Sequence, residues 1–230
     1  PVSPRRMGIL SRKNQMDAGL FSLADYLGQK DILTPLPYCI ATRDQVKSVM
    51  LFSNHGWLDL DGKKIGISDD TATSVKLLRI LLERKYKIKA KFIRMHSGVN
   101  DYSSFDAVLL IGDEALRRNK FGLSGFELVY DLAKEWYDWQ NLPFVFAVWA
   151  VKKSLPEEQR EELKSIISHA LEKAEEDFDS LGIMHGNHIG LSSHETAEYL
   201  GGFNYRLGER ERASMDVFQS MLKTVEIENV

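Results

Sequence analysis

Hydrophobic residues in the middle of the chain follow first a strand pattern and then a helix pattern. Lys64–Ser68 is a short apolar run, and Asp69–Tyr86 after it carries apolar residues three and four positions apart, as one face of an α-helix requires. Ala90–Met95 and Phe105–Ile111 are two further strand-like runs, and a helix is expected to begin with Gly112–Arg117. Because strands that alternate with helices favour a parallel sheet, this region is predicted to form a compact βαβ block.

The segments on either side of this block have other patterns. Before it, the sequence predicts a helix over Arg5–Gln15, strands over Asp17–Ser22, Leu33–Thr42 and Gln45–Ser53, and a short helix over Leu23–Leu27. After it come a very apolar strand, Leu142–Val151, and three amphipathic helices, Ser154–Ser180, Ser192–Leu200 and Glu211–Leu222. Ser154 and Ser192 each stand three residues before a glutamate, which is the spacing of a capping box. Gly186 and Gly190 predict a loop between the first two of these helices.

This order of elements predicts an α/β fold of two lobes. Each lobe is expected to hold a mainly parallel sheet flanked by helices, and the C-terminal part is expected to be helical. Residues 52–141 would form one lobe, and residues 1–51 with 142–230 the other. The chain would then cross between lobes at Lys47–Phe52 and Phe144–Val151, and a cleft between lobes is a usual place for a ligand. The same strands also fit one continuous doubly wound sheet.

Composition and charge exclude several classes of protein. The chain is 43% hydrophobic and 27% charged, which is ordinary for a globular protein, and its net charge of −3 gives no electrostatic reason to bind nucleic acid or an acidic membrane. Cys39 is the single cysteine, so no internal disulfide can form, and its apolar neighbours predict a buried side chain. No apolar run is long enough to span a bilayer, and no signal peptide is visible.

Hydroxyl groups gather where the first strand of the middle block gives way to its helix. In the segment Ser68–Ser74 (SDDTATS), Thr71, Thr73 and Ser74 would surround free backbone N–H groups at the positive end of the helix dipole. Such an end suits a carboxylate or a phosphate. Capping of the helix by Asp69, Asp70 or Thr71 is the competing interpretation.

A second candidate position follows the next strand, at Ile111–Glu114 (IGDE). Open α/β sheets bind ligands beyond the carboxyl ends of their strands, so Ile111 and Gly112 are predicted to line the cleft, with Asp113 as a helix cap. Ser22 and Ser48 stand in otherwise apolar strands and would either face the cleft or bond to backbone as small buried hydroxyls.

The sequence carries one cluster of histidines and lacks several common catalytic and nucleotide-binding motifs. His185, His188 and His194 lie close together, but they form no HExxH motif and no regular helix would place all three on one face. A solvent-facing loop is therefore predicted rather than a metal site, and no metal is expected. No Walker loop, GxGxxG, GxSxG or CxxC motif is present, so no nucleotide cofactor is expected.

Several longer stretches resemble one known family. GKKIGISDDTATSVKLLRILL, FDAVLLIGDEAL and YDLAKEWYDWQNLPFVFAVWAV are similar to the menaquinone-biosynthesis family that includes chorismate dehydratase. DAGLFSLADYL, VKSVMLFS and YRLGERERASMDVF resemble the same family in the same order, so the similarity runs from about Asp17 to Phe218.

The resemblance implies a periplasmic-binding-protein-like (type 2) fold used as a cytoplasmic enzyme. The implied reaction is the dehydration of chorismate to 3-[(1-carboxyvinyl)oxy]benzoate in the futalosine route to menaquinone, a carbon–oxygen lyase reaction with no metal or organic cofactor. The implied partner is a small anionic, chorismate-like substrate, with neither nucleic acid nor membrane. Ser22, Thr71, Thr73, Ser74, Ile111 and Gly112 would bind it, and Ser48 would act in catalysis.

Two other functions fit the same residues. One is 1,4-dihydroxy-6-naphthoate synthase of the same pathway, and the other is a solute-binding protein for a small carboxylate that has no catalytic activity. The sequence also departs from the family in two places. Family members typically begin with a strand that carries a YLNxxP-like motif, which this sequence does not contain, so the first strand of the first lobe is expected to be absent. Ser22 is followed by Leu23, where the family often has a second serine.

Overall fold

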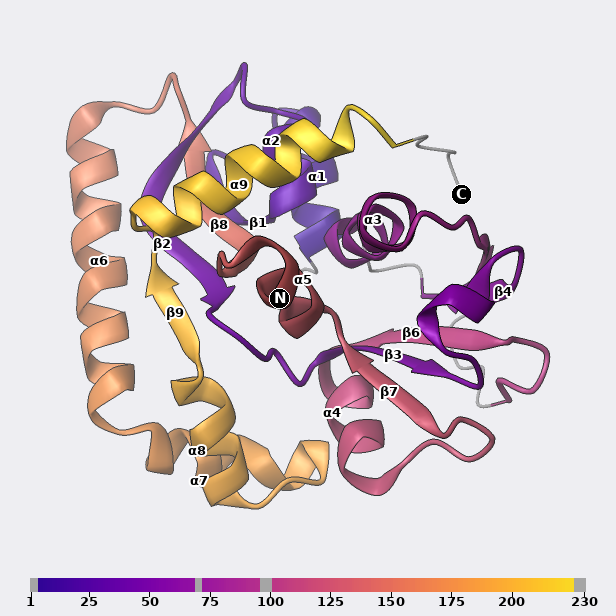
Figure 1. Cartoon of the computed structure of the whole chain (residues 1–230). Coiled ribbons are helices and arrows are strands. Elements are labelled where there is room, and N and C mark those ends of the chain that lie inside the picture. Colours follow the sequence, from indigo (N-terminus) through magenta and orange to yellow (C-terminus); the bar gives the residue numbers. More distant parts are fainter. Residues whose placement is uncertain (1–3, 69–71, 96–100, 226–230) are drawn as a thin grey trace.

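The computed structural model describes residues 4–68, 72–95 and 101–225, and within them the strands form two separate sheets. The first sheet has the order β1-β8-β2-β9, with β1 Ala18–Ser22, β2 Leu33–Thr42, β8 Phe144–Lys152 and β9 Phe203–Arg206. The second has the order β5-β4-β6-β3-β7, with β3 Val49–Ser53, β4 Lys64–Ile67, β5 Lys91–Arg94, β6 Ala107–Ile111 and β7 Leu128–Asp131. The two sheets lie side by side with helices around each, which confirms a two-lobed α/β fold (Figure 1).

Helices cover both faces of each sheet. On the first sheet, α6 (Glu157–Glu176) packs on the face that presents Leu36 and Val151, and α9 (Glu209–Leu222) packs on the face of Val148. On the second sheet, α4 (Gly112–Phe121) covers one face, while α3 (Ala72–Ile80), the π-helix η2 (Leu81–Tyr86) and α5 (Leu132–Gln140) cover the other. The remaining described helices are α1 Pro4–Arg12, α2 Leu23–Leu27, the 3₁₀ turn η1 Trp57–Leu60, α7 Phe178–Ile189 and α8 Ser193–Gly201. None of the helices that the structure describes is long and apolar enough to cross a membrane.

The direction of the strands corrects the expectation of mainly parallel sheets. In the first sheet β8 pairs antiparallel with both β1 and β2, and β9 pairs antiparallel with β2. The reason is that β8 brings the chain back from the second sheet and enters between two strands that run the other way. In the second sheet β4 is parallel to β5 and β6, as the βαβ pattern predicts, but β3 is antiparallel to β6 and β7.

The chain passes between the sheets at residues 43–48 and 141–143. All five residues of β3 pair within the second sheet, so the first passage comes before Val49, upstream of the expected boundary at residue 51. The division into residues 1–51 with 142–230 and 52–141 therefore stays a prediction in its detail, above all for the helices that contact both sheets.

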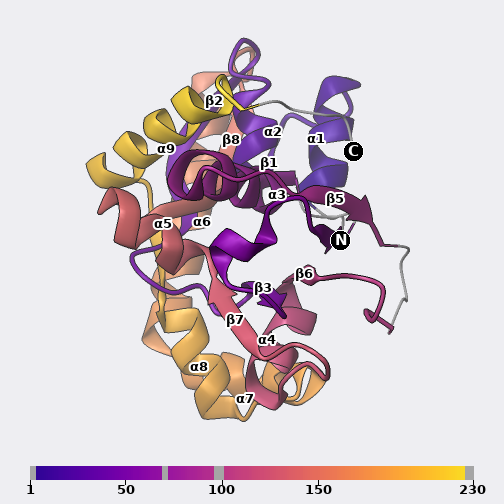
Figure 2. The same cartoon turned by 45° about the vertical axis from the view of Figure 1, so that its right-hand side comes forward.

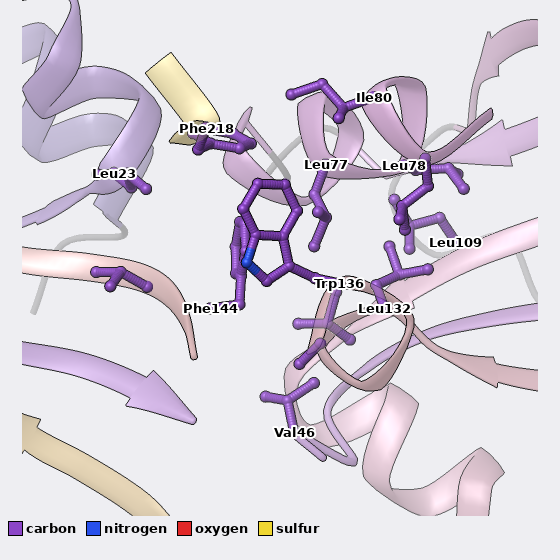
Figure 3. Packing of buried hydrophobic residues seen from close by; sticks show 14 of the residues in the cluster. Leu23, Val46, Leu77, Leu78, Ile80, Leu109, Leu132, Trp136, Phe144 and Phe218 are labelled. Atoms are coloured by element: carbon purple, nitrogen blue, oxygen red, sulfur yellow. The ribbon is translucent and has the colours of Figure 1, made fainter. Parts of the chain in front are cut away.

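One hydrophobic core joins the two lobes, and Trp136 of α5 is at its centre. Its indole is fully buried and makes edge-on contacts with Phe144 of β8 and Phe218 of α9, with ring centroids 5.4 and 6.1 Å away. Figure 3 shows the ring between these two residues and Leu77 of α3. The indole Nε1 donates to Ser214 Oγ at 3.1 Å, so its polar atom is also satisfied.

A second contact between the lobes lies at the periphery of the molecule. Helices α7 and α8 pack against each other and lie beside α4 in both views (Figures 1 and 2). Lys120 of α4 donates to Glu195 of α8 at 2.7 Å. Glu195 also completes the predicted capping box, because Ser192 Oγ accepts from its N–H and its carboxylate accepts from the N–H of Ser192.

Two expectations for the C-terminal part are wrong. The segment around His185 and His188 is helical, as part of α7, although its glycines predicted a loop. Helix α6 begins at Glu157 with Pro156 as its N-cap, so Ser154 caps nothing.

Replacing Trp136 with alanine is expected to lower the free energy of unfolding by about 3–5 kcal/mol, because it opens a cavity in the core that joins the lobes. Urea unfolding followed by circular dichroism measures this. Trp149→Ala is the matched control, since that half-buried ring lies on the α6 face of the first sheet. An equal loss in both variants would contradict a special role for the shared core.

The contact between α4 and α8 is expected to depend on pH. The hydrogen bond from Lys120, with a second from the N–H of Ser192, lowers the pKa of Glu195 to about 2. Because the folded pKa lies below the unfolded one, this stabilisation is present above about pH 4.5 and is lost as the pH falls toward about 2. The loss of stability in Glu195→Gln should therefore shrink when thermal midpoints are measured at decreasing pH. Glu198→Gln, on the same helix, serves as the control, and a pH-independent difference for Glu195→Gln would contradict the assignment.

Candidate active site at the carboxyl edge of the second sheet

The predicted site residues Ser48, Ile111 and Gly112 come together at one edge of the second sheet. Val49 pairs with Ile111 in the ladder of β3 and β6, and the N–H of Gly112 donates to the carbonyl of Ser48 at 2.8 Å. Ser48 is 6% exposed, and its Oγ accepts a hydrogen bond from the hydroxyl of Tyr199 at 2.9 Å. The backbone and the side chain of Ser48 are thus both held, from two different helices.

Two helices of the second lobe begin at this same edge. Strands β4 and β6 are parallel, so α3 after β4 and α4 after β6 both start beyond the carboxyl ends of their strands. Open α/β sheets bind ligands at such an edge, where free N–H groups and helix dipoles favour an anion. The helix starts thus have the placement that the sequence predicted for a carboxylate site.

Gly112 has a backbone conformation that few other residues adopt. Its φ is +61°, and apart from its chain neighbours and its own helix, no atom of the described residues lies within 4 Å of the position that a Cβ would occupy there. Ile111 is the N-cap residue of α4, so Asp113 is not the cap that the sequence predicted. The pKa of Glu114 in the first turn is lowered, because hydrogen bonds from Arg118 and Arg117 outweigh the effect of its burial.

Ser22 and Thr73 come together at the junction of α2 and α3. Ser22 is the N-cap of α2: its Oγ accepts from the N–H of Asp25 at 3.2 Å and donates to the Asp25 carboxylate at 2.9 Å. Thr73 Oγ1 accepts from the N–H of Ala24 at 3.0 Å, which ties the start of α3 to the first lobe. Ser74 is 6% exposed.

The predicted residues therefore form two groups. Thr71 lies outside the described residues. Among the residues that the structure describes, no hydrogen bond joins the Ser48 and Gly112 group to the Ser22 and Thr73 group. Thr73 at the start of α3 and Gly112 at the start of α4 follow strands of the second sheet, whereas Ser22 ends β1 of the first sheet.

Charged groups stand beside the junction of α2 and α3. Arg12 of α1 pairs with Asp25 at 3.2 Å. Burial lowers the pKa of Lys76 on α3, although the charge of Asp25 opposes this shift. The positive charges of Arg12 and Lys76 thus partly neutralise the negative charge of Asp25.

Asp131 positions Ser48 and was not among the predicted site residues. Its Oδ2 accepts from the N–H groups of Val46 and Lys47 at 2.9 and 2.7 Å, and its Oδ1 accepts from Ala133 and Lys134 at the start of α5. Burial raises the pKa of Asp131, and these four N–H bonds oppose that rise. Lys47 has a left-handed φ of 59°, a conformation that costs energy in a residue other than glycine. The bonds to Asp131 hold the turn in this conformation directly before Ser48.

The histidines, carboxylates and cysteine of the described residues are the groups that metal binding and thiol chemistry would use. In the part of the chain that the structure describes, no three His, Cys, Asp or Glu side chains are grouped so that they would hold a metal ion. Cys39 is buried as predicted, and its burial raises the pKa of the thiol to about 12.

Asp131 and Tyr199 were not among the predicted site residues, and only Asp131 has a local signal in the sequence. Asp131 directly precedes LAKEW, so an N-cap signal for a helix was present. Tyr199 lies 151 positions from Ser48, and no local pattern connects them.

Asp131→Ala is expected to lower the free energy of unfolding by about 1–3 kcal/mol, because it removes a helix cap and leaves partly buried N–H groups without this partner. Chemical denaturation measures this. Asp138→Ala removes an exposed carboxylate from the same helix and is expected to change stability little. Equal denaturation midpoints for the two variants would show that the hydrogen bonds to Asp131 do not stabilise the fold.

Known proteins support both the fold and the family. A family model described as menaquinone biosynthesis matches residues 3–224. The chorismate dehydratase of Thermus thermophilus is 30% identical over 95% of this chain and 84% of its own.

Solved structures agree with the lobed architecture. A protein from Archaeoglobus fulgidus superposes with a TM-score of 0.74 at 18% identity, over 97% of this chain and 84% of its own. The periplasmic aliphatic sulphonate binding protein SsuA from Escherichia coli has a TM-score of 0.68 at 12% identity, over 96% and 79% of the two chains. The fold is thus periplasmic-binding-protein-like, and with a family model that matches nearly its whole length, the chain belongs to the menaquinone-biosynthesis family.

Proposed function

We propose that this chain is a chorismate dehydratase, a carbon–oxygen lyase that forms 3-[(1-carboxyvinyl)oxy]benzoate and water from chorismate. The observation that carries the proposal is the 30% identity to the Thermus enzyme across 95% of the chain. We also infer that the protein works in the cytoplasm, in the futalosine-dependent route to menaquinone, without a metal or an organic cofactor.

The arrangement of the site supports a small dianionic substrate. Chorismate carries two carboxylates, and the starts of α3 and α4 at one sheet edge provide two positions where an anion is favoured. In this proposal Thr71, Thr73 and Ser74 hold one carboxylate. Gly112 is proposed to let the ring approach the backbone near Ser48, since beyond its own helix and chain neighbours no described atom lies within 4 Å of its Cβ position.

The reaction requires few reactive groups from the protein. Loss of a proton from the ring carbon that bears the enol ether, and of hydroxide from the neighbouring carbon, gives an aromatic ring and one water molecule. Aromatisation drives the reaction, so the protein has to orient the substrate and exclude bulk water. We propose that a carboxylate of the substrate takes the proton. Ser48 donates a hydrogen bond to this carboxylate and so positions it.

Incubation of the protein with chorismate, followed by chromatography for the aromatic enol ether, tests this function. Ser48→Ala is expected to lower kcat about a hundredfold, because a donor that orients the reacting groups is lost. Ser168→Ala is the matched control: this serine lies on α6 and bonds to Glu172, far from the sheet edge, and the change should leave turnover intact.

The outcomes separate the competing functions. Tight binding of chorismate without product would instead indicate a solute-binding protein, which is the function of SsuA with the same fold. Full activity of Ser48→Ala would remove Ser48 from the mechanism and leave the dehydratase assignment in place.

A further inference from the structure

The hydroxyl oxygen of Ser48 accepts a hydrogen bond from Tyr199 of α8, which restrains the serine side chain. The phenolic oxygen lies 2.9 Å from Ser48 Oγ. Burial, together with the charge of Asp113, raises the pKa of Tyr199, although the bond to Ser48 opposes this shift. The phenol therefore keeps its proton at neutral pH and is able to donate it.

The consequence for Ser48 follows from what a serine hydroxyl can do. Such a group has one proton to donate and two lone pairs that accept. When one lone pair accepts from Tyr199, the proton of Ser48 is directed elsewhere. The carbonyl of Ser48 accepts from Gly112, and Asp131 accepts from the N–H groups of the two preceding residues, so the bond from Tyr199 adds a restraint on the side chain to those on the backbone.

Tyr199 is itself held in place from two sides. Its ring packs edge-on against Phe203, with ring centroids 5.0 Å apart. Its helix, α8, is joined to α4 by Lys120 and Glu195, and α4 begins at Gly112, whose N–H holds the Ser48 carbonyl. The contacts form a closed ring from Ser48 through Tyr199, α8 and α4 back to Ser48.

We propose that Tyr199 is a positioning residue for Ser48: it donates its phenolic proton to Ser48 Oγ and so directs the serine proton toward a carboxylate of the substrate. This inference rests on the proposed function, and it deepens that function by naming the group that fixes the serine rotamer.

A double-mutant cycle on chorismate turnover tests the positioning role. Tyr199→Phe removes only the hydroxyl and keeps the ring against Phe203. It is expected to lower kcat about tenfold while KM changes less than about twofold, because orientation is lost rather than binding. In the Ser48→Ala background the same change should have no further effect, since Tyr199 acts through that serine.

Tyr205→Phe is the matched control. Its hydroxyl donates to the carbonyl of Leu200 at 2.8 Å and does not contact Ser48, so kcat should stay at the wild-type value. Thermal midpoints of all variants are measured, so that a loss of folded protein is not counted as a loss of turnover.

The measurements distinguish a failure of the positioning role from a failure of the dehydratase function. A tenfold loss that persists in the Ser48→Ala background, or a Tyr199→Phe variant with wild-type kcat, overturns the positioning role while the dehydratase function stands. A wild-type protein that forms no product from chorismate overturns the proposed function, and this inference fails with it.

Discussion

The partly buried carboxylate of Asp131 is the constraint on which both the core and the site depend. Backbone N–H groups that are removed from water must find an acceptor. Asp131 provides one for the turn before Ser48 with its Oδ2, and for the start of α5 with its Oδ1. Because α5 carries Trp136 into the core shared by the lobes, one side chain fixes the serine at the sheet edge and the helix that joins the two halves.

The two contacts between lobes differ in how easily they part. The packing of Trp136 against Phe144 and Phe218 is fully buried, and separating it would expose apolar surface. The pair of Lys120 and Glu195 is partly exposed, and such pairs contribute little free energy. The core around Trp136 is therefore the stronger of the two contacts that hold the lobes together.

The local elements of this fold were predictable because each has its own periodicity, whereas the contacts between distant elements were not. The bounds predicted for Leu23–Leu27 and Leu33–Thr42 are those of α2 and β2. Gly182 and Gly186 show where local reasoning fails. Gly186 predicts a loop, yet it lies inside α7, as does Gly182. The neighbouring helix explains why these positions are glycine: a Cβ at Gly182 would lie 2.1 Å from the carbonyl oxygen of Ser193. These glycines permit close packing of α7 and α8, and only the partner helix reveals that.

The candidate site likewise has local features that the sequence predicts and contacts between distant elements that it does not. The helix starts at Thr73 and Gly112 follow from a strand that ends and a helix that begins, so the sequence placed them at a sheet edge. That Ser48 joins Gly112 depends on the antiparallel register of β3 and β6, which no periodicity specifies. A protein that only binds its ligand needs affinity, but the proposed reaction also needs one hydrogen-bond donor held in one direction. Here the carbonyl, the preceding N–H groups and the hydroxyl of Ser48 are each held by a different element. That preorganisation is what would turn a binding-protein fold into a catalyst.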